Sequence, residues 1–566
     1  MKNKFKILLF LIFLIGLILR LYGLNWDQGQ HLHPDERFLT MYAVDTKLPS
    51  SLVQYLSTSS PLNPYNYPNY KFFVYGTFPI LLTKLIATPL NFDTYQYIHL
   101  IGRVLSALFD SLNIFLLFYF FKLILNNPKK ALIAPLIYAT TVLPIQLSHF
   151  FTVDTFLNFF TFASFTFLLY WLYRQKVIFL LISSLCFTLA LSSKISTLLF
   201  LPIIILIFIF YIYKTKSLKK FFLFSFIYFL LTLILLRLFS PYYFQGLVPN
   251  PLFINSLSTL KNLDNQYFPP AVQWLSKTKF IFPLRNLIFW ALGLPFSLVF
   301  IIGLFQKPKK IIFPVFISLV WLVFLFIFQS AQFSYALRYY LIIIPSLTII
   351  FSYFFQKFKY KSIFFFFHFL FLIGFLNVYR LPHSRLQASK WIYQNIPQGS
   401  IISCDHWDDC LPLSLLGQLP NQYNTVTFHL FDQDSTDKWL KIKDQLASLD
   451  YIIMSSSRLW GSISKVPDIY TQTSLFYQQL FSGQDILDSR VSFTKIAQFN
   501  NYPGFYLSFL KKCIYLGPSD YPGIKNNWFE VDNTCLYPGI YFRDDTADES
   551  FTVYDHPQVL IFKKNQ

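Results

Sequence analysis

The sequence contains little charge for its length. Charged residues make up 13% of the 566 residues, whereas hydrophobic residues make up 54% and aromatic residues 21%. Globular proteins that fold in water carry roughly twice this share of charge. The composition therefore excludes a soluble enzyme, a disordered chain and a solenoid, and it predicts a protein that crosses a membrane many times.

Acidic residues are scarce in the first two thirds of the chain. Residues 1–380 contain 32 Lys and Arg but only 8 Asp and Glu, whereas residues 381–566 contain 15 and 19. The net charge of +20 thus comes from cations beside apolar segments, where it indicates orientation in a bilayer rather than a nucleic-acid surface. We expect the lipid bilayer, and no nucleic acid, as a partner.

Long apolar runs recur through residue 380, each near the length that crosses about 30 Å of hydrocarbon. Eleven spans are predicted, at residues 7–24, 97–121, 131–148, 155–173, 177–193, 196–213, 221–239, 286–305, 311–328, 339–355 and 362–379. The first is expected to be retained, because it lacks the small-residue cleavage site of a signal peptide. Residues 72–87 are too short and polar for a span and are expected to form a helix in the outer interface.

The breaks between these runs alternate in charge. Six Lys/Arg-rich breaks hold 18 of the 32 cations and no acid; they lie at residues 2–6, 122–130, 174–176, 214–220, 307–310 and 357–361. With a cytoplasmic N-terminus, eleven spans place all six on the cytoplasmic side, as the positive-inside rule requires. We therefore predict a multi-pass protein of the cell membrane with residues 25–96, 240–285 and 381–566 outside.

Residues 381–566 have an ordinary soluble composition and form a second predicted domain after the transmembrane domain of residues 1–380. Helical patterns occur near 385–395, 436–448 and 467–480, and short apolar strands near 400–403, 424–429, 450–454, 493–498 and 557–563. Their alternation predicts a small extracytoplasmic α/β domain. Asp405–Asp409 is expected to be a solvated face of this domain, and Tyr554–Pro557 a turn.

Cysteine is rare, and its distribution fits an external domain. Of five cysteines, Cys186 lies in a predicted span and the other four lie after residue 381. An even number in an oxidising compartment suggests up to two disulfides. The favoured pairing is Cys404–Cys410 with Cys513–Cys535, although three pairings can be drawn and four buried thiols are the alternative. A zinc site is disfavoured because CxxC spacing is absent.

Two acidic positions at the outer face are candidates for chemistry. His31-Leu-His-Pro-Asp-Glu-Arg37 directly follows the first span, and a carboxylate there can act as a general base on a hydroxyl group. Asp154 lies at the outer end of the fourth span, on the same face of the membrane. The alternative is a solvated loop with a helix cap for the first position, and the N-cap of the fourth span for Asp154.

Several cations lie at outer span ends, against the general charge bias. They are Arg103, Lys194, Arg237, Arg285 and Arg338. Charges at the hydrocarbon boundary either extend to water or find a partner, and a lipid-linked phosphate is a natural partner for Arg. Arg338 ranks first because it follows the polar turn at residues 329–332, and Lys194 and Arg103 come next.

Taken together, these motifs resemble the membrane glycosyltransferases of family 39. That family includes the dolichyl-phosphate-mannose–protein mannosyltransferases and the lipid A aminoarabinose transferases, which share the GT-C fold. The segments that carry the resemblance are His-Pro-Asp-Glu-Arg at 33–37, Tyr75-Gly-Thr-Phe-Pro79, Gly102-Arg-Val-Leu-Ser-Ala-Leu108, Leu147-Ser-His-Phe-Phe-Thr-Val-Asp-Thr155, Trp391 and Asp405-His-Trp-Asp-Asp409.

The resemblance implies a GT-C-like helical membrane protein that moves a mannose-like sugar, with inversion, from a polyprenyl phosphate to an external hydroxyl group. The acceptor class, whether protein, lipid or glycan, stays open. By position in the family, the catalytic residues are Asp35, Glu36 and Asp154: Asp35 is the expected base, Glu36 supports acceptor or donor binding, and Asp154 is the second polar site. The expected substrate-binding residues are Arg338, Lys194, Arg103, His33 and His149.

No cofactor is expected, although some relatives can bind a divalent metal. His31, His33, Glu36 and His149 could supply ligands, but they lack a tight ligand spacing. The alternative function is a polytopic lipid or glycan transporter or flippase without transferase activity. Transporters usually place ionisable groups at mid-membrane and often show internal repeats. Here the acids of residues 1–380 cluster at the outer face, apart from Asp110, which lies within a span and is interpreted as a packed polar contact, and no clear repeat is found.

Overall fold

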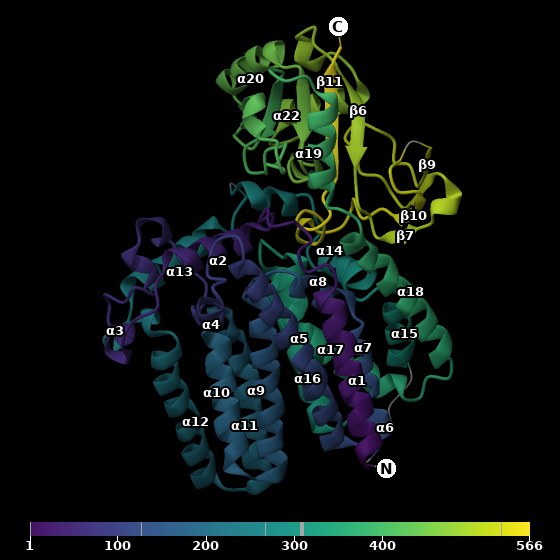
Figure 1. Cartoon of the computed structure of the whole chain (residues 1–566). Helices are drawn as coiled ribbons and strands as arrows, with labels where there is room; N and C mark the ends of the chain where they lie inside the picture. Colours follow the sequence, from purple (N-terminus) through teal and green to yellow (C-terminus); the bar gives the residue numbers. More distant parts are fainter. Residues whose placement is uncertain (1, 126, 267, 306–310, 534, 566) are drawn as a thin grey trace.

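The computed structural model describes residues 2–125, 127–266, 268–305, 311–533 and 535–565. A bundle of long helices forms one end of the molecule and a sheet-containing domain forms the other (Figure 1). The N-terminal helix starts at the end of the bundle that lies farthest from this domain, and the chain finishes within the domain.

Helices fall at every one of the predicted spans. The bundle contains α1 (Lys2–Leu21), α5 (Ile98–Ile124), α6 (Pro128–Ala131), α7 (Ile133–Ala139), α8 (Val142–Ser148), α9 (Asp154–Arg174), α10 (Val177–Leu191), α11 (Leu201–Thr215), α12 (Leu218–Phe239), α14 (Ile281–Asn286), α15 (Leu294–Phe305), α16 (Phe313–Ala331), α17 (Ile344–Phe355) and α18 (Lys361–Arg380). Two 3-10 segments, η4 (Ile195–Phe200) and η8 (Leu337–Ile343), lead into α11 and α17.

The number of eleven spans is not confirmed. In the described residues, seven helices are long and apolar enough to cross a membrane, or nine if each of two bent pairs counts as one span. The bent pairs lie at Pro128–Ser148, with a bend of 55°, and at Ile281–Phe305, with a bend of 117°. Two other predicted spans fall on α1, which carries Lys at one end and Arg20 at the other, and on α10, which has 15 residues.

Four helices lie in the loops at the end of the bundle that faces the sheet domain. They are α2 (Pro34–Asp45), α3 (Leu52–Leu56), α4 (Phe78–Ala87) and α13 (Pro251–Leu263) (Figure 1). The ten residues of α4 extend about 15 Å, too little to cross a bilayer. This agrees with the prediction of a short helix that does not span, although it starts six residues later than predicted.

The C-terminal domain contains the predicted α/β arrangement. A five-stranded sheet has the order β4-β3-β5-β11-β6, formed by β3 (Ile401–Asp405), β4 (Asn424–Phe428), β5 (Tyr451–Met454), β6 (Phe493–Phe499) and β11 (Val559–Lys564). The main helices of this domain are α19 (Ser384–Asn395), α20 (Thr436–Ser448) and α22 (Thr471–Ser482). All five predicted strands and all three predicted helices are confirmed within a few residues.

A second, four-stranded sheet follows β6 and was not predicted. Its order is β7-β10-β8-β9, formed by β7 (Gly504–Tyr506), β8 (Cys513–Leu516), β9 (Phe529–Asp532) and β10 (Gly539–Phe542). The favoured cysteine pairing is confirmed, because Cys404 bonds Cys410 and Cys513 bonds Cys535. A short helix, α23 (Glu549–Thr552), then precedes β11.

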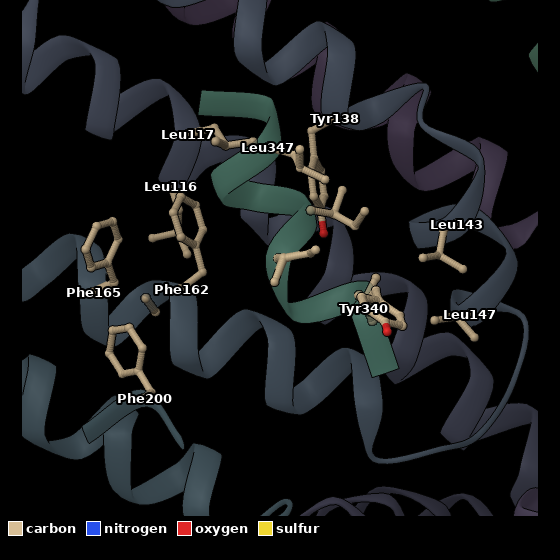
Figure 2. Packing of buried hydrophobic residues seen from close by; sticks show 14 of the residues in the cluster. Leu116, Leu117, Tyr138, Leu143, Leu147, Phe162, Phe165, Phe200, Tyr340 and Leu347 are labelled. Atoms are coloured by element: carbon tan, nitrogen blue, oxygen red, sulfur yellow. The ribbon is translucent and has the colours of Figure 1, made fainter. Parts of the chain in front are cut away.

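The centre of the bundle is packed with aromatic and aliphatic side chains. Figure 2 shows Leu116 and Leu117 of α5, Phe162 and Phe165 of α9, and Leu347 of α17 gathered around the central helices, each at most 8% exposed. A buried ion pair lies in the same bundle: Asp110 accepts hydrogen bonds from Arg20 Nε at 2.8 Å and Tyr138 Oη at 2.6 Å. The interpretation of Asp110 as an internal packing contact is confirmed.

Candidate active site

The acidic motif forms the first turn of α2. Pro34 is the first helical residue, and His33 caps the helix through its Nδ1 atom, which accepts a hydrogen bond from the Glu36 amide at 3.4 Å. The motif thus begins a helix, but its cap is a histidine and the motif is largely buried, so the alternative of a solvated loop is wrong. The N-cap alternative is also wrong for Asp154, because the capping position of α9 is Val153, which has no side-chain cap bond. Consecutive side chains of a helix point about 100° apart, so Asp35 and Glu36 face different surroundings.

Glu36 lies in a fully buried ion cluster. Its carboxylate accepts bonds from Arg103 Nε at 2.9 Å and Nη2 at 2.5 Å, and from the Phe151 amide at 2.6 Å. Arg103 also binds both carboxylate oxygens of Asp27 at 3.0 Å. The three charged side chains are 0% exposed. Gly102 allows α5 to pack closely against Phe151, because a Cβ atom at residue 102 would lie 2.2 Å from the Phe151 ring.

Asp35 is oriented differently and remains partly exposed. Its carboxylate forms an ion pair with Arg338, and the two side chains are 23% and 17% exposed. Burial opposes ionisation of Asp35, but the Arg338 charge, with help from His33 and Lys194, outweighs it and holds the pKa of Asp35 below its ordinary value. Tyr75 lies within hydrogen-bonding reach of the same carboxylate.

A second ion pair lies beside the first. Lys194 Nζ is 3.0 Å from Asp154 Oδ1, and the two side chains are 25% and 8% exposed. The Tyr339 ring connects the pairs, because its centroid is 5.1 Å from Lys194 Nζ and 5.4 Å from Arg338 Cζ. The structure therefore brings Asp35, Asp154 and both predicted phosphate ligands together around one tyrosine, which sequence reasoning did not single out.

The two predicted histidines have internal partners. The His33 ring packs between Phe150 and Tyr554, at centroid distances of 4.6 and 4.1 Å, and burial lowers its pKa to about 4. His149 has both ring nitrogens 2.8 Å from main-chain carbonyl oxygens, and its ring stacks on Tyr379. Their predicted contact with substrate, like that of the buried Arg103, stays a prediction.

The C-terminal domain contacts the membrane domain beside this region. Asp409 binds Arg37 at 2.7 Å and Arg385 at 2.6 Å, and Asp408 also binds Arg385. The expectation of a solvated acidic face at residues 405–409 is therefore wrong for this part of it, because arginines from both domains pair with these carboxylates. Tyr554, expected to be part of a plain turn, packs on His33 at the edge of the site.

No group of three or more His, Cys, Asp or Glu side chains in the described part of the chain is arranged to hold a metal ion. His31 lies against Tyr95 and His99 rather than against Glu36 or His149. The candidate ligands therefore make other contacts. His31 packs against aromatic rings, whereas hydrogen bonds hold His33, Glu36 and His149. Independence from metal stays a prediction about turnover.

Comparison with known proteins supports the class inferred from these motifs. Residues 99–244 match the family model of the dolichyl-phosphate-mannose-protein mannosyltransferases. That segment contains Arg103, Asp154 and Lys194, so the resemblance predicted from the sequence is confirmed over this part of the chain. The match, in a chain rich in membrane-length apolar helices, supports a membrane glycosyltransferase.

No curated protein sequence matches the chain. Among solved structures, the oligosaccharyltransferase of Archaeoglobus fulgidus is 13% identical, with a TM-score of 0.47 over 83% of this chain and 71% of its own. ArnT from Cupriavidus metallidurans is 11% identical, with a TM-score of 0.44 over 94% and 98%. The Pmt1-Pmt2 protein O-mannosyltransferase of S. cerevisiae is 17% identical, with a TM-score of 0.33 over 44% and 35%.

Proposed function

We propose that the protein transfers a sugar from a polyprenyl phosphate to a hydroxyl group outside the membrane, with inversion at the anomeric carbon. The observation that carries this proposal is the pair of partly exposed ion pairs, Asp35–Arg338 and Asp154–Lys194, which both lie against the Tyr339 ring. They provide two cations for a phosphate and a carboxylate for an attacking hydroxyl group in one place.

The ion pairs define a resting state that donor binding would change. A donor phosphate competes with Asp35 for Arg338 and with Asp154 for Lys194, because guanidinium and ammonium groups bind phosphate oxygens strongly. Once Arg338 turns to the phosphate, the charge that lowers the pKa of Asp35 moves away. Asp35 then becomes the stronger base that deprotonation of a hydroxyl group requires.

The transfer step conserves atoms and charge. The acceptor oxygen forms a bond to the anomeric carbon, the bond from that carbon to the phosphate oxygen breaks, and the acceptor proton passes to Asp35. Polyprenyl phosphate leaves as an anion that Arg338 and Lys194 stabilise, so a general acid is unnecessary. The sugar, whether mannose or another, and the acceptor, whether protein, lipid or glycan, are the choices left to experiment.

Asp35→Asn provides the test. With purified protein in lipid, radiolabelled polyprenyl-phosphate mannose and a panel of peptide, lipid and glycan acceptors, the variant should lose transfer by roughly 100-fold or more, because it removes the base and keeps its shape. Asp93→Asn, in the same external loop but in contact with Thr88, is the matched control. Normal turnover by a well-folded Asp35→Asn protein would contradict the proposal.

Mass spectrometry of surface proteins and lipids from cells with and without the chain would identify the acceptor. The same transfer assay in the presence of a chelator, with and without added divalent ions, tests the expectation that turnover needs no metal. A protein that moves lipid-linked sugar across vesicles without forming any glycoside bond would instead be a flippase.

A further inference from the structure

A cavity of about 340 Å³ lies within the C-terminal domain, between its two sheets. One wall is the four-stranded sheet, and the other is formed by β6 and α19. Figure 1 shows these elements together on one side of the domain, with β9 and β10 beside β6. Its volume is in the range of small-molecule sites. The acidic pair, Arg338 and Lys194 do not line it.

The strand register explains why polar side chains gather there. Tyr515 pairs with Glu530 across β8 and β9, and Cys513 pairs with Asp532. Paired residues of neighbouring strands point to the same face of a sheet, so Tyr515, Glu530 and Asp532 share a face, while Phe529 and Val531 point to the other. The shared face lines the cavity.

The opposite wall contributes an aromatic side chain and further polar groups. Trp391 of α19 is half-buried, lines the cavity and packs on Phe499 at a centroid distance of 6.1 Å. Lys495 and Gln498 of β6 also line it, and Lys495 Nζ donates to Gln498 Oε1 at 2.9 Å. The cavity thus combines an indole with carboxylates, an amide and an ammonium group.

This set of groups suits a neutral ligand with many hydroxyl groups. Carboxylates accept hydrogen bonds, an ammonium donates them, and an amide does both, which matches hydroxyl groups that also do both. The C–H face of a pyranose ring carries slight positive charge and packs on the negative face of an indole. The two acids, Glu530 and Asp532, are offset by Lys495 and by Arg543, which pairs with Glu530, so a phosphate gains little there.

We propose that this cavity is a saccharide-binding site, separate from the transfer site, which takes one or two sugar units of a glycan. Its use as a holding site for the acceptor or product rests on the proposed function. Binding of the saccharide itself does not, because no donor is involved.

The experiment measures binding without any lipid donor. Full-length protein is placed in lipid nanodiscs, since maltoside detergents carry the very head group under test. Methyl glycosides of mannose, glucose, galactose and N-acetylglucosamine, and the corresponding disaccharides, are titrated by saturation-transfer NMR and tryptophan fluorescence. At least one series should show saturable binding, and inorganic phosphate should not compete.

Two variants and a control locate the site. Trp391→Ala should weaken saccharide binding about tenfold, as loss of a central aromatic contact does. Asp532→Asn, which keeps the side-chain shape, should weaken it about threefold or more and serves if Trp391→Ala fails to fold. Trp528→Ala removes a 67% exposed tryptophan just before β9 and should leave binding unchanged.

The inference is overturned if no glycoside binds saturably, if phosphate displaces the sugar, or if Trp391→Ala and Asp532→Asn bind as the unmodified protein does. Equal loss in Trp528→Ala would also overturn it. A protein that transfers sugar but fails these tests would keep the proposed function and lose only this site. Saccharide binding without transfer to any acceptor would support this site and contradict the proposed function.

Discussion

Two adjacent carboxylates show how strongly local position determines the role of a residue. Asp35 and Glu36 are neighbours in one helical turn, yet the Asp35 side chain is 23% exposed and the Glu36 side chain is 0% exposed. Glu36 and Asp27 together hold Arg103, so these groups organise the chain around α2. Two carboxylates thus share one guanidinium, so removing either acid leaves Arg103 paired with the other and costs the charge-assisted hydrogen bonds that are lost.

Glu36→Gln should therefore act on stability before chemistry. Gln cannot accept both charge-assisted hydrogen bonds from Arg103, whereas Asp27 still compensates the Arg103 charge, so the expected loss is about 1.5–3 kcal/mol. Thermal unfolding of the protein in lipid measures this loss, with Asp93→Asn as control, and turnover is normalised to folded protein. Unchanged unfolding combined with abolished turnover would instead make Glu36 a substrate contact, as the family resemblance implies.

Arg338→Ala should weaken the lipid donor more than the acceptor. Hydrogen bonds to charged groups contribute about 1.5–3 kcal/mol, which corresponds to roughly a 10- to 100-fold rise in the donor KM. Arg285→Ala is the matched control, because Arg285 lies at another outer span end and contacts Thr546. Arg338→Lys should recover part of the donor affinity. A rise confined to the acceptor KM would remove Arg338 from the phosphate site.

The main acids and cations of this site could be found from their positions in the sequence, because charge at an outer span end is rare enough to stand out. Their partners could not be found in that way. Arg103, like Lys194, lies at a predicted outer span end, but it reaches Glu36 and Asp27 beside the close contact that Gly102 allows, so it lies in a buried cluster. Tyr554 lies more than 500 residues from His33 and has no motif to connect them.

At the scale of elements, the segment from Asp544 to His556 fastens the C-terminal domain to the bundle. Asp555 accepts hydrogen bonds from Tyr379 Oη at 2.6 Å and Gln146 Nε2 at 3.1 Å, both from the membrane domain. His556 lies between Asp555 and Asp544, with its ring nitrogens 2.5 and 2.8 Å from their oxygens. This clamp holds Tyr554 beside the candidate active site.

The clamp should make domain docking depend on pH. Burial opposes the charge on His556, but Asp555 and Asp544 outweigh it and raise its pKa to about 10. A raised pKa means that the stabilisation is complete below the unfolded value of about 6.5 and is lost as pH rises through about 10. Limited proteolysis between the domains should accelerate over that range.

His556→Ala should abolish this pH dependence and destabilise docking by about 3–5 kcal/mol, because two buried carboxylates then lack their cation. His429→Ala is the matched control, since His429 is a 43% exposed histidine in the same domain. If proteolysis of the unmodified protein is equally slow at pH 6 and pH 10, the clamp does not depend on the His556 charge.

Three of the predicted strands, β3, β5 and β11, have continuous apolar character and are largely buried. The other two, β4 and β6, are mostly exposed or half-buried. The second sheet was missed because its strands have only three or four residues, and β8, β9 and β10 place alternate side chains along a polar cavity. Strands this short carry little periodic signal, and their pairing depends on contacts distant in sequence.

For the whole molecule, the question is which end of the bundle faces the cytoplasm. The start of α1 and the C-terminal domain lie at opposite ends of the bundle (Figure 1). The cation-rich breaks then predict a cytoplasmic N-terminus and an external C-terminal domain. Two disulfides in that domain fit an oxidising compartment.

Cysteine labelling in intact cells tests this orientation directly, because the chain provides a low background. Four cysteines are in disulfides and Cys186 is buried, so a membrane-impermeant maleimide should find little to modify. Ser59→Cys and Leu416→Cys should be labelled from outside, whereas Lys219→Cys should be labelled only after permeabilisation. Labelling of Lys219→Cys in intact cells would place the cation-rich loops outside. Because the candidate active site lies at the end of the bundle beside the C-terminal domain, that result would also place the sugar transfer in the cytoplasm.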